Sequence, residues 1–366
     1  MRPLGAALLA TLVLGFLPGL AAADPAVGLA PPIGSFIDDE EECLEATPAA
    51  YDLPSPDREL VLEVLVLLDG PTLEDGRKVL ERAADSYSPM GIELRPKYEI
   101  VDFEPETVDG NTESSHYRRL VQDAKDHTVG ERPPDIDLVY VMTTKAIDGA
   151  AGFADCIGGV RYPNRAYSVG EYHAEEVLSL GLNFYVDRNA ETLSHELGHL
   201  MGAHHHYANC GQGAGADDVT NREPAPCTLM FNFLDFTSIN FSALNAAVVT
   251  GHAEAFASDT PSPSMVFDRR IQLKLKGHVR AEGVATTTGP KTCVQRVQVE
   301  IARRYRAQDQ WGVLGAVKTD RSGRFRMELA EDAPALYRAQ VRVMELDGGK
   351  GGYCRQFATA AITHTH

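Results

Sequence analysis

A run of histidines around one glutamate has the residue types and spacing of a catalytic metal site. Residues 195–205 read His-Glu-Leu-Gly-His-Leu-Met-Gly-Ala-His-His. On a helix, His195 and His199 project from one face about one turn apart, so both imidazoles can bind the same ion. Gly202 permits the positive φ at which helices commonly end, and the turned chain can then bring His205 to that ion. Three nitrogen ligands with a fourth position open to water are typical of catalytic zinc.

Glu196 is the expected general base of this site. It stands beside the first ligand and not on the ligand face, which suits proton transfer from water better than metal binding. The pattern therefore predicts hydrolysis by a zinc-activated water, with Glu196 passing the proton to the departing amine. An amphipathic helix with surface histidines is the alternative, but it requires neither the glutamate nor the glycine at these offsets.

The pattern HExxHxxGxxH resembles the defining motif of the metzincin metallopeptidases, and the resemblance extends over roughly residues 58–256. Within that clan the chain is most similar to the reprolysin (adamalysin-like) family. Two further segments carry the resemblance, Gly152-Phe153-Ala154 followed by Cys156, and Cys227-Thr228-Leu229-Met230. It implies that a substrate strand pairs along Gly152, Phe153 and Ala154. It also places Met230 in a turn beneath the zinc, whereas the alternative for Met230 is an ordinary core methionine.

Two positions depart from the relatives' patterns. Reprolysins usually carry aspartate directly after the third ligand, where this chain has His206. We expect His206 to take over the supporting role of that aspartate. The residue two after Met230 is Asn232 and not the tyrosine of astacins, so stabilisation of the tetrahedral intermediate would rest mainly on zinc.

These features predict a secreted zinc-dependent endopeptidase that holds one catalytic Zn²⁺ and acts on proteins or peptides. A catalytically silent adhesion or binding protein on the same scaffold is the second candidate, against which the intact Glu196 argues. Hydrolysis of a non-protein amide would use the same zinc chemistry and stays open, as does a requirement for calcium.

The segments around the motif alternate between strand-like and helical patterns. This alternation predicts an α/β (α+β) catalytic domain with a mixed, mostly parallel sheet. The expected strands are 60–68, 91–103 and 135–142, with short ones at 152–154 and 166–169, and the expected helices are 73–88, 117–124, one that begins at Asn189 or Ala190, and 241–256.

The last quarter of the chain has a different pattern and a different charge. Residues 24–270 carry a formal net charge of −26, whereas residues 271–366 carry +7, and such a change of sign marks a domain boundary. We expect a catalytic domain over 58–257, a linker over 258–268 and a smaller all-β sandwich over 269–366. The expected strands of the sandwich are 271–281, 293–306, 311–319, 324–329, 337–345 and 353–362.

The first residues of the chain have the pattern of an export signal. Arg2, an apolar stretch and Ala21-Ala22-Ala23 predict a signal peptide over 1–23 and hence an extracellular or periplasmic location. An N-terminal membrane anchor is the alternative. Residues 24–57 form an acidic leader, interpreted either as a solvated arm or as a pro-segment that covers the site.

Charge and hydropathy also limit the partners. A formal net charge of −18 argues against nucleic acid as a partner. After the signal, no segment approaches the length of a transmembrane helix, so stable membrane insertion is not expected.

Six cysteines follow the expected signal peptide, an even count that favours disulfides in an exported protein. A first bond would hold the turn that contains Met230 against the site, and a second would staple the strands of the sandwich. The remaining two cysteines pair with each other, or else Cys43 ligates zinc as an inhibitory thiolate in a latent form. In this order, the expected pairs are Cys210 with Cys227, Cys293 with Cys354, and Cys43 with Cys156.

Overall fold

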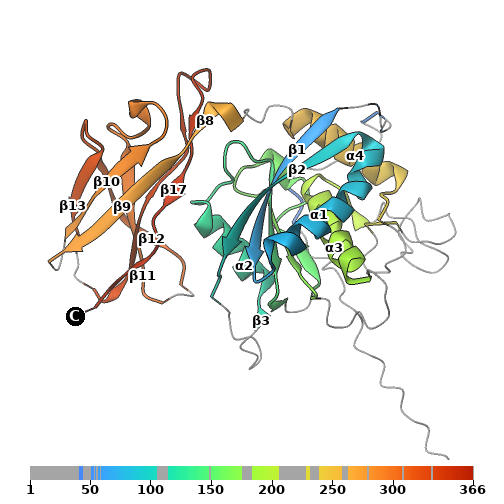
Figure 1. Ribbon diagram of the computed structural model, residues 1–366, viewed down its shortest axis with the longest axis horizontal. Coiled ribbons are helices and arrows are strands. Elements are labelled where there is room, and N and C mark those ends of the chain that lie inside the picture. Colours follow the sequence, from blue (N-terminus) through green and yellow to red (C-terminus); the bar gives the residue numbers. More distant parts are fainter. Residues whose placement is uncertain are drawn as a thin grey trace, which may run out of the picture. The chain divides into compact units, whose positions relative to one another are not determined.

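The computed structural model of the chain contains an α/β region with the histidine motif and, later in the sequence, an all-β region (Figure 1). All the residues that it describes fall in one compact unit, Ile33–His366. It describes residues 41–43, 51, 52, 54, 57, 59–104, 114–147, 150–174, 184–205, 228–230, 239–257, 263–277, 280–306, 309–330 and 333–365. The predicted signal peptide and most of the acidic leader lie outside these ranges.

A five-stranded sheet forms the centre of the α/β region. Its order is β2-β1-β4-β7-β6, in which β6 is antiparallel to β7 and the other neighbours are parallel. The mixed, mostly parallel sheet predicted from the sequence is therefore confirmed. Its strands are β1 (Leu60–Asp69), β2 (Ile92–Val101), β4 (Leu138–Thr143), β7 (Tyr167–Glu171) and β6 (Gly152–Ala154), and the short strands β3 (Ser114–Ser115) and β5 (Ala146–Ile147) pair separately.

The nearly continuous apolar run of β1 is explained by burial on both faces of this sheet. Val64 and Val66 lie in the core on one face, whereas Leu65 and Leu67 lie in the core on the other. Successive residues of a strand point to opposite faces, so a central strand covered on both sides needs apolar residues throughout.

One face of the sheet is covered by more helices than the other (Figure 1). The helix α1 (Leu73–Tyr87) and the helix that carries the motif, α3 (Phe184–Leu200), contribute residues to one core, and α2 (Tyr117–His127) contributes residues to the other. Thr72 and Asp75 form a capping box that begins α1. After α3 come α4 (Ala243–His252) and a π-helical turn, η6 (Ala253–Ala257).

The motif helix begins earlier than the sequence pattern indicates. α3 begins at Phe184 and not at Asn189 or Ala190. The helix begins with Phe184, Tyr185 and Val186, aromatic and β-branched residues of modest helix propensity, so its beginning was placed one to two turns too late. Short 3₁₀ turns, η2 (Ser88–Met90) and η3 (Gly159–Arg161), connect elements elsewhere in this region.

The all-β region consists mainly of two sheets that share one hydrophobic core, as expected of a sandwich. One sheet has the order β13-β10-β9 and the other β12-β11-β14-β17, with β18 also paired to β14. The strands are β8 (Val266–Phe267), β9 (Arg269–Lys276), β10 (Arg280–Thr287), β11 (Gln298–Arg304), β12 (Gly312–Lys318), β13 (Arg324–Glu328), β14 (Ala335–Val341), β15 (Met344–Glu345), β16 (Tyr353–Cys354), β17 (Phe357–Ala358) and β18 (Ile362–His364), and the 3₁₀ turns are η7 (Pro263–Met265) and η8 (Lys291–Cys293).

Several strand predictions in this region were wrong in their bounds. The expected strand 271–281 is interrupted by a turn at Gly277, which has a φ of 57°. The part of β10 that follows residue 281 was not predicted. The buried positions of this strand are Ala281 and Ala285, whose small side chains give a weak alternation of apolar and polar residues. The segments 337–345 and 353–362 are likewise divided into two and three short strands.

Two further expectations from the sequence concern the linker at 258–268 and the absence of a membrane-spanning segment. Residues 258–262 of the expected linker lie outside the described ranges, and Val266–Phe267 form β8, which pairs with β16 of the all-β region. Among the helices that the structure describes, none is both long and apolar enough to cross a membrane.

The disulfide between Cys293 and Cys354 closes a loop of 61 residues in the core of the all-β region, where both residues are fully buried. Replacing both cysteines with alanine should lower the free energy of unfolding of the all-β region by about 3–4 kcal/mol. Thermal and urea unfolding of the oxidised protein would measure this loss. Unchanged stability would show that the bond does not constrain the unfolded chain.

Candidate metal centre

Three histidines of the motif converge on one point. The Nε2 atom of His195 lies 3.0 Å from Nε2 of His199 and 3.0 Å from Nε2 of His205. The Nε2 atoms of His199 and His205 are 3.1 Å apart. Among the described residues these three form a group that could hold a metal ion.

The triangle of nitrogens fits a tetrahedral ion. Ligand nitrogens at ~2.0–2.1 Å from zinc in tetrahedral geometry lie ~3.3 Å from each other, close to the separations observed here. Neutral imidazole is a donor that zinc prefers, and three such ligands are the set of a catalytic site. The donor set and its spacing are therefore those of a zinc centre.

The far nitrogen of two of these rings is fixed by a backbone carbonyl. His195 Nδ1 donates to the carbonyl of Leu229 at 2.8 Å, and His199 Nδ1 donates to the carbonyl of Ala203 at 2.9 Å. These bonds place the proton on Nδ1 and leave the Nε2 lone pair directed at the metal position. Burial lowers the pKa of both imidazoles well below the ordinary value, so both stay neutral.

A glycine turn brings His205 back to the face of the helix that carries the other two ligands. Gly202 has a φ of 87°, the left-handed conformation at which helices commonly end. The amide of Ala203 donates to the carbonyl of Gly198 at 2.9 Å and closes the turn. A Cβ on Gly202 would lie 2.4 Å from Cε1 of His252, so the close approach of α4 also requires glycine.

Asn245 of α4 holds the backbone next to the third ligand. Its Oδ1 accepts the amide of His204 at 2.9 Å, and its Nδ2 donates to the carbonyl of His204 at 3.0 Å. Both bonds act on the residue directly before His205, so they fix the direction in which its ring leaves the chain. Sequence analysis missed this residue, although a lone asparagine inside the apolar segment Ala243–Val249 was a signal that a buried partner was needed.

Met230 packs against the motif helix at Gly198. Its Sδ is 2.9 Å from the point that a Cβ on Gly198 would occupy, between the two helical histidines. Met230 is fully buried and lies in the same core as Leu197. The neighbouring Leu229 supplies the carbonyl that holds His195, so the turn and the ligand are directly coupled.

Glu196 is fully buried beside the edge strand β6. A Cβ on Gly152 would lie 2.5 Å from Oε1 of Glu196, so only glycine lets the strand approach this carboxylate. Burial raises the pKa of Tyr140 well above its ordinary value, and the nearby charge of Glu196 raises it further. A Cβ on Gly170 would lie 1.8 Å from the hydroxyl oxygen of Tyr140, so this position requires glycine.

The three residues expected to bind substrate form β6, the last strand of the sheet. Gly152 and Ala154 pair with β7 on one side. Phe153 lies in the core on the α2 face, whereas Ala154 lies in the core on the α3 face. On its other side, β6 ends the order of strands in this sheet among the residues that the structure describes.

Part of the acidic leader lies beside the same edge. Cys43 is joined to Cys156 by a disulfide, so this cysteine is not a thiolate ligand in this structure. The amide of Cys43 donates to the carbonyl of Ile157, and the amide of Ile157 donates to the carbonyl of Glu41, both at 2.9 Å. Glu42 contacts the residue before the third histidine of the group, with its Oε1 3.4 Å from Nε2 of His204.

Four residues that the sequence analysis singled out lie outside the described ranges, so their predicted roles remain predictions. They are His206, Asn232, Cys210 and Cys227.

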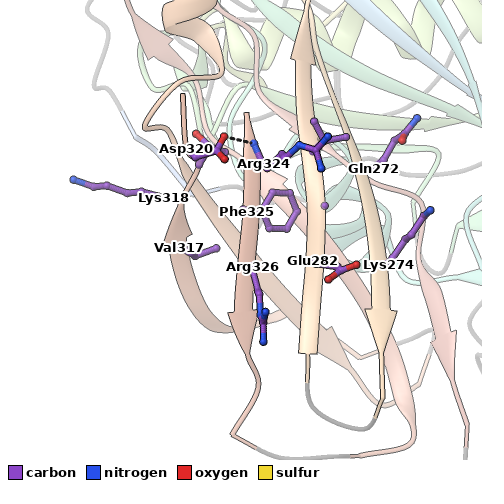
Figure 2. A pocket seen from close by; sticks show the side chains of 12 residues that line it. Gln272, Lys274, Glu282, Val317, Lys318, Asp320, Arg324, Phe325 and Arg326 are labelled. Carbon is purple, nitrogen blue, oxygen red and sulfur yellow. Dashed lines mark hydrogen bonds between the residues drawn. The ribbon is translucent and has the colours of Figure 1, made fainter. Parts of the chain in front are cut away.

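A hollow of about 550 Å³ lies apart from these residues, on the all-β region (Figure 2). Figure 2 shows Lys274, Arg324 and Arg326 along it. The amide of Arg324 donates to Asp320 Oδ1 at 2.9 Å, which orders the turn at one end. None of the predicted site residues lines this hollow.

Comparison with known proteins agrees with the motif. Residues 74–206 match the model of the metallo-peptidase family M12B, reprolysin-like. The resemblance to the reprolysin family that the motif indicated is thereby confirmed over these residues, and the match supports a zinc peptidase. Among solved structures, the archaemetzincin from Methanopyrus kandleri is similar to this chain at 15% identity and a TM-score of 0.33, over 54% of this chain and 96% of that one. No curated protein matches the sequence.

Single alanine substitutions should distinguish the role of His205 from that of His204. His205→Ala should lose most of the bound zinc, because its Nε2 completes the triangle of ligands. His204→Ala should retain zinc, since the bonds from Asn245 hold its backbone, which the substitution leaves in place. Mass spectrometry of the purified, folded variants measures the zinc content. Full zinc in His205→Ala, with loss in His204→Ala, would overturn the assignment.

Substitutions of Asn245 should weaken metal binding without removing a ligand. Asn245→Ala should lower zinc affinity by about 10–100-fold, the usual effect of removing a group that orients a ligand. Asn245→Asp keeps the acceptor for the His204 amide and should lose less. Competition with a chromophoric chelator measures both affinities, and circular dichroism controls for folding. Equal, wild-type affinity in the two variants would contradict the role given to Asn245.

Proposed function

We propose that this chain, whose residues 74–206 match a reprolysin-like metallopeptidase, is a secreted zinc-dependent endopeptidase. The observation that carries the proposal is the convergence of three imidazoles next to a buried glutamate and the edge strand β6. His195, His199 and His205 would hold the zinc ion, and Glu196 would be the general base.

The chemistry divides between the metal and the protein. When bound, zinc supplies a Lewis acid that polarises a carbonyl and lowers the pKa of water toward ~7. Glu196 takes the proton of the attacking water and returns it to the nitrogen of the departing amine. Its burial beside Gly152 keeps its carboxylate close to the edge at which the scissile bond would lie.

The sheet edge explains why the substrate would be a peptide. An extended chain that adds to β6 forms main-chain hydrogen bonds with it, and this mode of binding is independent of sequence. Gly152 brings this strand into contact with Glu196, so the added peptide bond would lie beside the base. Addition to a strand edge requires no free terminus of the peptide, so cleavage within a chain is favoured over removal of terminal residues.

The wider organisation is part of the same proposal. We place the catalytic domain at 58–257 and the all-β domain at 269–366, which is supported by their separate hydrophobic cores. Export through a signal peptide at 1–23 is supported by two disulfides, which persist in oxidising compartments. The alternative of a silent binding protein is not favoured, because the base and all three ligands are present.

Glu196→Gln should abolish most activity while zinc stays bound. The amide fills the same buried space but cannot take a proton, so kcat/KM should fall by at least ~10²-fold, the usual contribution of a general base. An internally quenched peptide substrate measures the rate, and the zinc content of the same sample is the control. A zinc-loaded variant that cleaves at a near-normal rate would refute this mechanism.

A further inference from the structure

A second, smaller pocket lies next to the substrate strand. It has a volume of about 310 Å³, enough for a charged side chain and several waters at ~30 Å³ each. Helix α2 lines it with Arg118 and Lys125, β6 and the following residue line it with Phe153 and Asp155, and Arg165 adds a third cation.

The pocket is positively charged where it meets β6. Lys125 Nζ and Arg165 Nε both lie 2.8 Å from Oδ2 of Asp155, so two cations share one carboxylate. Arg165 Nη2 also donates to the backbone carbonyl of Asp155 at 2.9 Å, which orients the guanidinium. Arg118 also lines the pocket and is exposed. Three cations against Asp155 leave a cavity that favours an added carboxylate.

The leader already places a carboxylate in this cavity. Glu41 Oε2 accepts a hydrogen bond of 2.7 Å from Arg165 Nη2, and this bond holds the pKa of Glu41 below its usual range. The Glu41 side chain is otherwise 69% exposed, so it can leave the cavity at little cost. The disulfide of Cys43 keeps it nearby, which makes Glu41 an internal occupant of a site for acidic side chains.

Side chains along a strand alternate between the two faces of a sheet, and this alternation explains how a substrate side chain would reach the same pocket. Phe153 belongs to the core on the α2 face, and the pocket lies beside its side chain. A peptide added to the edge of β6 also directs alternate side chains to the two faces of the sheet. Side chains on the α3 face approach Glu196 and the ligands, whereas those on the α2 face approach Arg118 and Lys125.

We propose that this pocket is a specificity site that binds an acidic side chain of the peptide substrate and that Glu41 occupies it in the absence of substrate. The proposal rests on the peptidase function proposed above. It makes peptides with glutamate or aspartate near the cleaved bond the favoured substrates.

The first test compares matched peptides with the wild-type protein. Internally quenched peptides that carry one glutamate, moved position by position across the cleaved bond, are paired with glutamine peptides of the same sequence. We expect about tenfold higher kcat/KM for glutamate, the usual scale of a charge-assisted hydrogen bond. The preference for glutamate should appear at substrate positions that are two residues apart, and the position between them should show no such preference.

Two surface variants test the pocket itself. Arg118→Glu should reduce the preference for glutamate and favour lysine at the same position. Glu41→Gln should raise kcat/KM for glutamate peptides more than for glutamine peptides, because it removes the internal competitor. Arg161→Gln is the matched control, since Arg161 is an exposed arginine that does not line the pocket. It should keep the wild-type ratio of glutamate to glutamine cleavage.

The outcomes separate this proposal from the function on which it rests. Cleavage of glutamate and glutamine peptides at equal rates, or an unchanged preference in both variants, overturns the acidic specificity and leaves the peptidase intact. Failure of the zinc-loaded wild type to cleave any peptide overturns both proposals.

Discussion

The site depends on the carbonyl groups that hold the far side of its buried imidazoles. A buried histidine that lost its Nδ1 partner would leave a polar atom unsatisfied, at a cost of ~1–3 kcal/mol, and its Nε2 would lose direction. Leu229 and Ala203 supply these carbonyls from two turns that flank the helix. The geometry of the metal centre is therefore determined by how closely both turns pack against α3.

Small residues make that close packing possible. Gly198 admits the sulfur of Met230 beneath the helix, and Gly202 admits His252 and turns the chain. Gly152 does the same for the edge strand and Glu196. Side chains at these positions would push apart the elements that carry the ligands, the base and the substrate strand. The leader joins this arrangement through the disulfide of Cys43, which keeps an acidic segment beside the strand edge where substrate would bind.

The sequence predicted the parts of the molecule whose information is local. Helical spacing placed His195 and His199 on one face, and the apolar run at 60–68 predicted the central strand. Contacts between distant segments were not predictable in this way. Asn245 acts across 41 residues on His204, and nothing in its own segment shows which backbone it would bind. Residues 282–287 were missed because the buried positions of β10 carry alanine, which gives no strong alternating pattern.

The central claim is that the three imidazoles and Glu196 form a zinc-dependent peptidase. The most direct measurement is cleavage of an unfolded protein by the purified chain at known zinc content, before and after chelation and after zinc is restored. The account predicts about one zinc per chain and cleavage at internal bonds that stops with the chelator and returns with the metal. Cleavage that persists in the metal-free chain, or a fully loaded chain that cleaves nothing, would contradict it.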